Sequence, residues 1–509
     1  MTDGGLAELL FVRDPHFRPD SCTDVSACPP QPAAAAARLR CGSSRRGGGG
    51  DPPDGVADGA VARLGELLRR RRGVVTAVQV IVAAFYVGLI TVPAFLPLPA
   101  MDARMGSSLT LVAQFLFWGL WWPFVIVSVL LAGRLWCGLL CPEGALSEFA
   151  SRHGLGLGIP RWLRWPGWPL TAFLATTVYG QLVSVYDYPK PALLVLGGST
   201  LAAMAVGFLY GRGKRVWCRH LCPVNGVFGL LARVAPLHFR VDRRRWESSI
   251  DPRGAVDCAP LVDIRRMTGA AQCHMCGRCS GQRGAVTLAL RAPGREVLEL
   301  PQESVNPWEA RLLVFGVIGT AIGAFQWSAS PWFVAAKQLA AEWAVTRRLW
   351  WLLDSGAPWW ALTHYPQTAD TFTWLDGLLI LAYIGAAALI IGGWVWSWLH
   401  VAAACLPGRR SINAARLAYA LIPIGGIGVF LGLSVLTVTM LAAEGVRLPG
   451  LEWGRGLLLS AGAAWSAVLG WRLLRFRETP RVRIWAAYGA LLAALSGVLV
   501  SWSLLFFIW

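Results

Sequence analysis

The sequence predicts an all-α integral membrane protein with about nine transmembrane helices. Of its 509 residues, 55% are hydrophobic and only 15% are charged, and the mean hydropathy is +0.49. Apolar stretches of about 18 to 28 residues recur along the chain, and stretches of this length can cross a bilayer as helices. Soluble domains carry a larger share of charged residues, so the composition favours a membrane protein.

Residues 1–60 are expected to be a disordered tail. They are rich in Pro, Ala and Gly and cannot bury enough apolar surface to fold alone. They also lack the ordered charged, apolar and cleavage-site segments of a secretory signal. Three cysteines in this tail have spacings that match no metal motif, and we interpret them as solvent-exposed thiols: Cys22, Cys28 and Cys41.

The nine apolar stretches follow this tail in order. The shortest is the eighth, and the ninth is unusually aromatic. They lie near residues 74–96, 109–133, 168–186, 191–211, 309–329, 374–401, 412–441, 455–471 and 484–508. An odd number of crossings places the two ends of the chain on opposite sides of the membrane.

Lys and Arg are distributed unevenly between alternate loops. Sixteen of them lie between residues 212 and 295, and further groups precede the first stretch and follow the second, sixth and eighth. Because basic loops remain in the cytoplasm, we predict a multi-pass protein of the bacterial inner membrane with its N-terminus inside. These loops also explain the net charge of +18 without a nucleic-acid partner.

One short pattern occurs twice in the first part of the membrane region. Residues 136–142 read WCGLLCP and residues 217–223 read WCRHLCP, and each copy follows an apolar stretch and a basic turn. Two copies indicate an internal duplication. Residues 61–235 are therefore predicted to form duplicated transmembrane hairpins with both motifs on the cytoplasmic face. Pro142 and Pro223 are expected to begin or break helices.

Each motif carries two cysteines four residues apart, so their thiols face the same way on a helix. If a pseudo-twofold axis relates the hairpins, the two pairs converge on one metal site at the membrane surface. Four soft thiolates there would suit a second iron-sulfur cluster or a Cu(I) ion. The alternative is that these small side chains only pack at helix ends. The residues are Cys137, Cys141, Cys218 and Cys222.

Residues 236–308 form the longest basic loop and carry a triplet of cysteines at positions i, i+3 and i+6. Such a triplet can cover one face of a [4Fe-4S] cluster and leaves the fourth iron for another ligand. One further cysteine lies fifteen residues before the triplet. The predicted cluster ligands are Cys258, Cys273, Cys276 and Cys279.

Four thiolates can also hold a structural zinc ion, which is the alternative for this loop. Structural zinc normally uses two separate CxxC knuckles, whereas an overlapping CxxCxxC favours the face of a cluster. Gly277 and Gly281 suit tight turns around a cluster. His274, inside the triplet, is expected to be a solvated loop residue rather than a ligand.

The two motifs and the following loop resemble the membrane-bound polyferredoxin-like proteins. The resemblance rests on the GRLWCxxxCP of residues 133–142, the WCxxxCP of residues 217–223 and the cysteine loop, and covers residues 74–290. The group includes the membrane ferredoxin of periplasmic nitrate reductase systems, the nitrous-oxide reductase regulator and the cytochrome oxidase accessory protein. The resemblance implies membrane electron transfer, with the loop cysteines as cluster ligands and the motif cysteines as redox or metal-handling thiols. Several relatives have two ferredoxin-like clusters where this loop encodes one.

Three hypotheses follow. The first is a [4Fe-4S] electron-transfer protein, rather than a stand-alone enzyme, that connects a cytoplasmic or quinone donor with a respiratory or maturation partner protein. The second is an accessory protein whose motif thiols bind or reduce copper during oxidase assembly. The third is a transporter with a structural zinc site, which the scarcity of charges within the membrane disfavours. Residues 309–509 are expected to add C-terminal transmembrane helices in contact with lipid.

Overall fold

The computed structural model describes residues 56–100, 102–249, 256, 258–475 and 480–509. These residues belong to one compact unit, which begins at Asp54. Cys22, Cys28 and Cys41 lie outside the described residues, as does most of the expected tail. Helix α1 (Val56–Arg70) begins before residue 60, so the last residues expected in the tail are helical.

The chain is mostly helical, as the sequence predicts. In the described part of the chain, eight helical spans are long and apolar enough to cross a membrane. They are Arg72–Phe95, Leu109–Ala132, Pro189–Tyr210, Pro307–Gln326, Trp374–Ala404, Arg410–Ala443, Leu451–Arg475 and Arg481–Ile508.

The third expected stretch forms a shorter helix, α7 (Trp168–Leu182), of 15 residues. At 1.5 Å per residue it is about 22 Å long, less than the roughly 30 Å of a bilayer core. It ends near Ser184, whose φ of 46° cannot continue a right-handed helix. The spans before and after α7 nevertheless end at the same site, because both WCxxxCP motifs line one cavity. A ninth crossing, by α7 between the two hairpin motifs, therefore stays a prediction.

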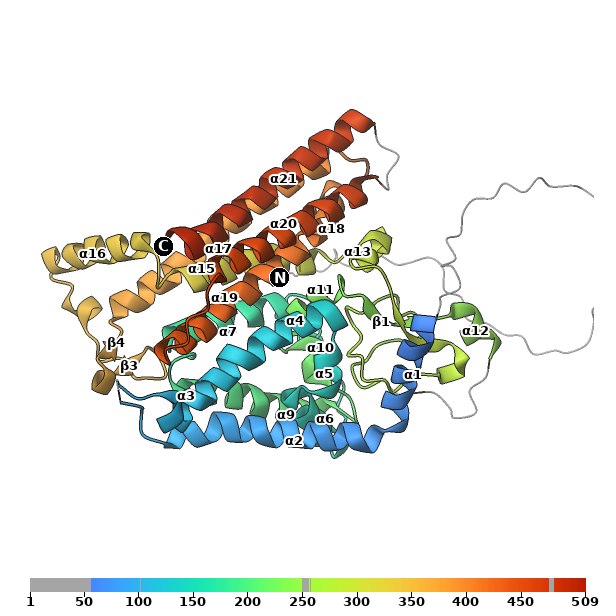
Figure 1. Cartoon of the computed structure of the whole chain (residues 1–509), viewed down its shortest axis with the longest axis horizontal. Coiled ribbons are helices and arrows are strands. Elements are labelled where there is room, and N and C mark those ends of the chain that lie inside the picture. Colours follow the sequence, from blue (N-terminus) through green and yellow to red (C-terminus); the bar gives the residue numbers. More distant parts are fainter. Residues whose placement is uncertain (1–55, 101, 250–255, 257, 476–479) are drawn as a thin grey trace, which may run out of the picture. The chain divides into compact units, whose positions relative to one another are not determined.

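The duplication is visible in the order of the elements around the two motifs (Figure 1). In each copy a long helix leads to a short helix with the first cysteine, and a third helix follows the second cysteine. The two series are α4 (Trp122–Ala132), α5 (Leu135–Leu139) and α6 (Pro142–Arg152), then α9 (Gly198–Tyr210), α10 (Val216–His220) and α11 (Asn225–Ala232). α6 packs along α9 so closely that a Cβ atom at Gly207 would lie 2.5 Å from the carbonyl oxygen of Ser147.

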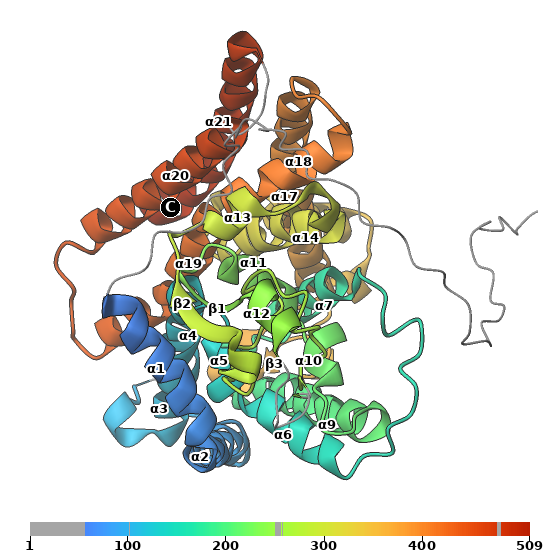
Figure 2. The same ribbon diagram turned by 90° about the vertical axis from the view of Figure 1, so that its right-hand side faces the viewer.

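A two-stranded antiparallel sheet closes the cysteine loop. Strand β1 (Leu237–Val241) pairs with β2 (Val286–Leu290), and Phe239 lies opposite Leu288. These side chains join Ile264 and Met275 in a small apolar core. α1 packs on β2, as Figure 2 shows, and a side chain at Gly65 would collide with Leu288. The loop therefore has a core of its own, covered by the first helix.

The C-terminal helices pack against the hairpins. α19 (Ile422–Ala443) contacts α4, and the Thr437 hydroxyl donates a 2.5 Å hydrogen bond to the carbonyl of Gly119. Trp502, on α21 (Arg481–Ser503), is fully buried against Gly428. The other elements are α2 (Arg72–Thr91), α3 (Leu109–Gln114), α8 (Pro189–Ala192), α12 (Arg243–Ser248), α13 (Arg295–Glu299), α14 (Pro307–Arg311), α15 (Ala321–Gln326), α16 (Pro331–Thr346), β3 (His364–Tyr365), β4 (Asp370–Thr371), α17 (Trp374–Ala404), α18 (Arg410–Ala418) and α20 (Leu451–Arg475).

Candidate functional site

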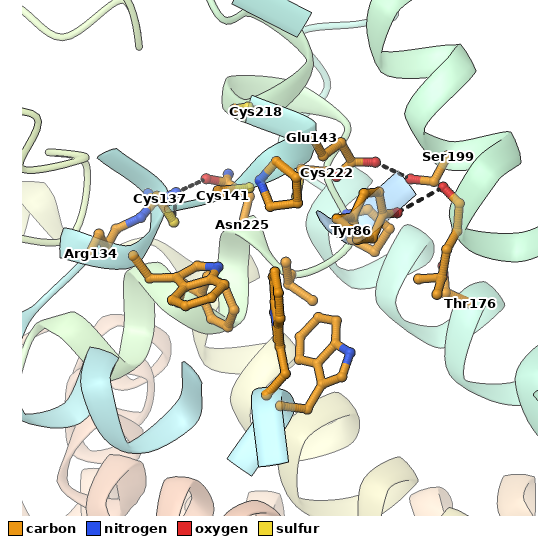
Figure 3. A pocket seen from close by; sticks show the side chains of 18 of the residues that line it. Tyr86, Arg134, Cys137, Cys141, Glu143, Thr176, Ser199, Cys218, Cys222 and Asn225 are labelled. Carbon is orange, nitrogen blue, oxygen red and sulfur yellow. Dashed lines mark hydrogen bonds between the residues drawn. The ribbon is translucent and has the colours of Figure 1, made fainter. Parts of the chain in front are cut away.

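The four cysteines of the WCxxxCP motifs line one cavity, as Figure 3 shows. The cavity has a volume of about 180 Å³ and is otherwise lined mainly by aromatic and apolar side chains. The two pairs thus converge, as the sequence predicts for hairpins related by a pseudo-twofold axis. We call these four residues the hairpin tetrad: Cys137, Cys141, Cys218 and Cys222.

Local backbone geometry brings the hairpin thiols together. Cys141 is the N-cap residue of α6, and its sulfur accepts a 3.4 Å hydrogen bond from the amide of Gly144. Pro142 occupies the first helical position, which needs no amide donor. A Cβ atom at Gly144 would lie 3.6 Å from the sulfur atoms of both Cys141 and Cys218. One thiol from each hairpin therefore faces the same point.

The four cysteines predicted from the loop also come together, around a second cavity of about 20 Å³. Left-handed residues turn the backbone inside and after the triplet: Met275 has a φ of 51°, Gly277 of 74° and Gly281 of 72°. The expectation of tight turns at the two glycines is confirmed. The Met275 amide donates a 3.3 Å hydrogen bond to the sulfur of Cys273. We call the group the loop tetrad: Cys258, Cys273, Cys276 and Cys279.

Both tetrads have the donor chemistry of a [4Fe-4S] site. Four thiols face one space in each, and backbone amides already donate to one sulfur atom in each. Burial raises the pKa of Cys218 and that of Cys273 to about 12. Such buried thiols become thiolates when a cationic metal centre compensates their charge.

A site for a single metal ion requires closely spaced ligands. Zinc-thiolate bonds are about 2.3 Å long, so the ligands of one ion must lie close together. Among the described residues, no group of three or more His, Cys, Asp or Glu side chains is placed to hold one metal ion. The nine cysteines of this part of the chain are all free thiols.

The two tetrads lie next to each other. The turn that carries Cys137 packs directly on the cysteine triplet, because a Cβ atom at Gly138 would lie 2.0 Å from the carbonyl oxygen of His274 and 2.8 Å from the amide nitrogen of Cys276. On the other side, the Arg215 amide donates a 2.7 Å hydrogen bond to the carbonyl of Ala259, the residue after Cys258. Both WCxxxCP motifs thus contact the loop that holds the loop tetrad.

Two buried arginines stand at this contact. Arg134 is 3% exposed; one of its terminal nitrogens lies 3.9 Å from the sulfur of Cys137, and the other donates to the carbonyl of Ala271 at 2.9 Å. Arg215 is 2% exposed and donates to the carbonyl of Cys137 at 2.6 Å. The sequence pattern predicts only a basic turn at Arg134 and Arg215 and does not predict their contacts with the tetrads. The feature that could have indicated these contacts is their equal offset, three residues before the first cysteine of each motif.

Glu148 on α6 connects the hairpins with the loop. Its carboxylate accepts a 2.8 Å hydrogen bond from Arg215 and a short one from Arg278, which lies within the cysteine triplet. Burial by itself would raise the pKa of Glu148, but the two arginines more than offset burial and hold the pKa at about 2. The carboxylate is therefore ionised and compensates two cations beside the tetrads. Nothing in the sequence pattern singled out this residue.

The expectation that His274 is solvated is wrong. Its ring is 2% exposed, and its Nε2 atom lies 3.0 Å from a terminal nitrogen of Arg134. Burial, followed by the charge of Arg134, holds the pKa of His274 well below its usual range, so the ring is neutral. The ring is enclosed because the loop packs onto the hairpin turn, a long-range contact that the local pattern does not reveal.

Polar groups cluster at one end of the hairpin cavity (Figure 3). Glu143 accepts a short hydrogen bond from Ser199, and burial raises the pKa of Glu143. Tyr86 shares a 3.1 Å hydrogen bond with Thr200. A second apolar cavity, of about 160 Å³, shares Trp122, Thr176 and Phe228 with the first and extends between the membrane spans.

A family model described as a 4Fe-4S binding domain matches residues 114–180 and 194–245. Both WCxxxCP pairs lie inside these ranges. This part of the chain is similar to ferredoxin-type 4Fe-4S proteins, which agrees with the resemblance to the membrane-bound polyferredoxin-like group. The match ends before Cys258, so the loop tetrad lies outside it. The chain thus carries a 4Fe-4S cluster, and the matched residues of the domain include the hairpin tetrad.

Several curated proteins are similar to the ferredoxin-type domain and its surroundings. A putative electron transport protein of Escherichia coli, YccM, is 26% identical over 229 residues, which are 39% of this chain and 62% of that protein. The ferredoxin-type protein NapH of Haemophilus influenzae is 28% identical over 176 residues, 30% of this chain and 61% of that protein. The methylamine utilization ferredoxin-type protein MauN of Methylorubrum extorquens is 28% identical over 151 residues, 28% and 50% respectively.

The matches thus cover about three fifths or less of the length of these relatives. No solved structure is significantly similar to the chain. The relatives agree in being named as electron transport or ferredoxin-type proteins, which supports an electron-transfer role for this chain.

Proposed function

We propose that this protein transfers electrons at the surface of the bacterial inner membrane, from a cytoplasmic or quinone donor to a respiratory or maturation partner protein. The observation that carries the proposal is the direct packing of two cysteine tetrads against each other, one in the ferredoxin-type domain and one in the loop. Electron transfer between two centres needs such proximity and a water-poor environment, and buried Arg134 and Arg215 stand at this contact.

Each tetrad would hold one [4Fe-4S] cluster, with Cys258, Cys273, Cys276 and Cys279 around one and Cys137, Cys141, Cys218 and Cys222 around the other. When bound, such a cluster supplies a centre that gains or loses one electron at a time. A cluster with four thiolates carries net negative charge, so the nearby guanidinium groups would stabilise its reduced form. The amides that already donate to Cys141 and Cys273 would act in the same direction.

The distribution of Lys and Arg supports a cytoplasmic position for both tetrads. The loop tetrad lies in the segment between residues 212 and 295, which holds sixteen of these residues. The hairpin tetrad packs against the same segment. A soluble donor on the cytoplasmic side would thus meet the loop before the hairpins.

The apolar cavity at the hairpin tetrad supports quinone as the redox partner within the membrane. Aromatic and apolar side chains line most of it, and it shares residues with the second apolar cavity between the spans. Its polar end offers the Glu143 carboxyl group and the hydroxyls of Ser199 and Thr176. An apolar pocket with a few convergent polar groups suits a ring with oxygen substituents and an apolar tail.

Anaerobic purification in detergent tests the proposal. We expect about eight irons and eight sulfides per chain, and about four of each in a Cys137→Ala/Cys218→Ala double variant. The spectrum of the dithionite-reduced protein should show interacting paramagnets in the parent and a single centre in the variant. Four irons in both proteins would confine the cluster to one tetrad. Copper at the hairpin tetrad, or zinc without iron, would contradict the proposal and support the corresponding rival.

A further inference from the structure

Another cavity lies beside the tetrads and is strongly cationic. Its volume is about 240 Å³, and its lining differs from that of the two apolar cavities because polar groups predominate. Three arginine side chains line it: Arg134, Arg164 and Arg219. We call it the cationic cavity.

Little negative charge faces these cations. Glu309 is the one carboxylate among the residues that line the cavity, and it already binds Arg233 at 2.7 Å and the Tyr419 hydroxyl at 3.0 Å. Within the described ranges, Arg134, Arg164 and Arg219 form no ion pair with a carboxylate. Arg219 donates to the amide oxygen of Gln272 at 3.3 Å, a neutral partner. Several cations in one cavity without compensation repel each other unless an anion joins them.

The backbone adds to the positive electrostatic potential in the cationic cavity. α7 and α11 both begin at the cavity, where Pro169 and Asn225 line it. The positive ends of two helix dipoles therefore point towards the same space, an arrangement that favours anions. The indole rings of Trp165 and Trp308, 5.3 Å apart, line the cavity beside these helix starts. Tryptophan of this kind is common at the level of lipid headgroups.

We propose that the cationic cavity binds a phosphate group. Guanidinium groups pair with phosphate oxygens through two parallel hydrogen bonds, and Arg164 and Arg219 offer two such groups. Arg134, whose terminal nitrogens already bind Ala271, Asn225 and His274, adds its positive charge. The phosphate belongs either to the headgroup of an anionic phospholipid or to a soluble phosphate compound. The chemistry of recognition is the same for both.

Arg134 gives this site a consequence for electron transfer, and this step rests on the proposed function. The same guanidinium group that lines the cavity lies 3.9 Å from the sulfur of Cys137. A phosphate bound in the cationic cavity would offset the positive charge of Arg134 beside the hairpin tetrad. A cluster there would then be harder to reduce, because less positive charge stabilises its additional electron. Phosphate binding would thus regulate the potential of this cluster.

Titration of the full-length holoprotein with inorganic phosphate, followed by calorimetry, tests the binding itself. We expect Arg164→Gln to weaken binding at least tenfold, since it removes a charge-assisted hydrogen bond of about 1.5–3 kcal/mol. Arg164 is exposed and far along the chain from every cysteine, so the variant should keep its iron. The matched control is Arg161→Gln, which removes an exposed arginine of the same loop that does not line the cavity.

A second experiment distinguishes a phospholipid headgroup from a soluble phosphate compound. The protein is reconstituted in nanodiscs of phosphatidylcholine alone or with phosphatidylglycerol, and the reduction potential of the clusters is followed by EPR. A lower potential only with the anionic lipid identifies a headgroup, whereas a lower potential on addition of phosphate identifies a soluble compound. The proposal is overturned if the parent shows no binding by calorimetry and no change in potential with either the anionic lipid or phosphate, or if Arg164→Gln binds as tightly as the parent. A chain without iron that still binds phosphate would contradict the proposed function instead.

Discussion

At the scale of single residues, Glu148 is the group on which the buried charges depend. It is 4% exposed and compensates Arg215, which is 2% exposed, as well as Arg278. Glu148→Gln would leave both cations without their anion, and we expect a loss of about 3–5 kcal/mol in the free energy of unfolding. Arg152→Gln is the matched control, because this exposed arginine pairs with the same carboxylate at 3.5 Å and should cost less than about 1 kcal/mol. Thermal unfolding of the detergent-solubilised proteins measures both.

The same carboxylate makes the difference between parent and variant depend on pH. Because the pKa of Glu148 is lowered from 4.5 to about 2, its stabilisation is complete above pH 4.5 and is lost as the pH falls towards 2. The gap in unfolding temperature between the parent and Glu148→Gln should therefore be constant from pH 7 to pH 5 and shrink below that. A gap that stays constant down to pH 3 would show that the ionisation of Glu148 does not supply this stabilisation.

At the scale of elements, the short helix α5 must approach the cysteine triplet without a side chain at Gly138. Gly138→Ala would place a methyl group 2.0 Å from the backbone oxygen of His274, and backbone cannot move aside as a flexible side chain can. We expect the loop to shift and to lose its cluster, so that the iron content falls by about four per chain. Gly385→Ala on α17 is the control, since its Cβ atom meets nothing within 4 Å. Parent-like iron content in Gly138→Ala would contradict the proposed contact between the tetrads.

At this scale the sequence predicts features that depend on residues close together in the chain, but not those that depend on contacts between distant segments. The spacing within each WCxxxCP copy and within the triplet is local, and their repetition was enough to predict two groups of four thiols. The enclosure of His274 and the pairing of Arg215 with Glu148, 67 residues earlier, arise from contacts between distant segments. Hydropathy likewise predicted α7 but not that Ser184 would end it early.

At the scale of the whole molecule, the orientation in the membrane decides which partners reach the tetrads. α7 carries the chain between the two hairpin motifs, and its far end is held by the segment before α17: the Thr363 amide donates to the carbonyl of Leu182 at 2.9 Å. Gly158, on the near side of α7, and Gly356, in that segment, should therefore lie on opposite sides of the membrane. We expect an epitope tag at Gly356 to bind antibody in intact spheroplasts and a tag at Gly158 to bind only after permeabilisation.

Each other outcome of this labelling has a definite meaning. Binding to both tags in intact cells would show that α7 does not cross, although both motifs line one cavity. Binding only to the tag at Gly158 would place both tetrads on the outer face, where a cytoplasmic donor cannot reach them, and would contradict the proposed direction of access. Full iron content in both tagged proteins is the control, because it shows that neither insertion has displaced the hairpins that carry Cys137 and Cys218.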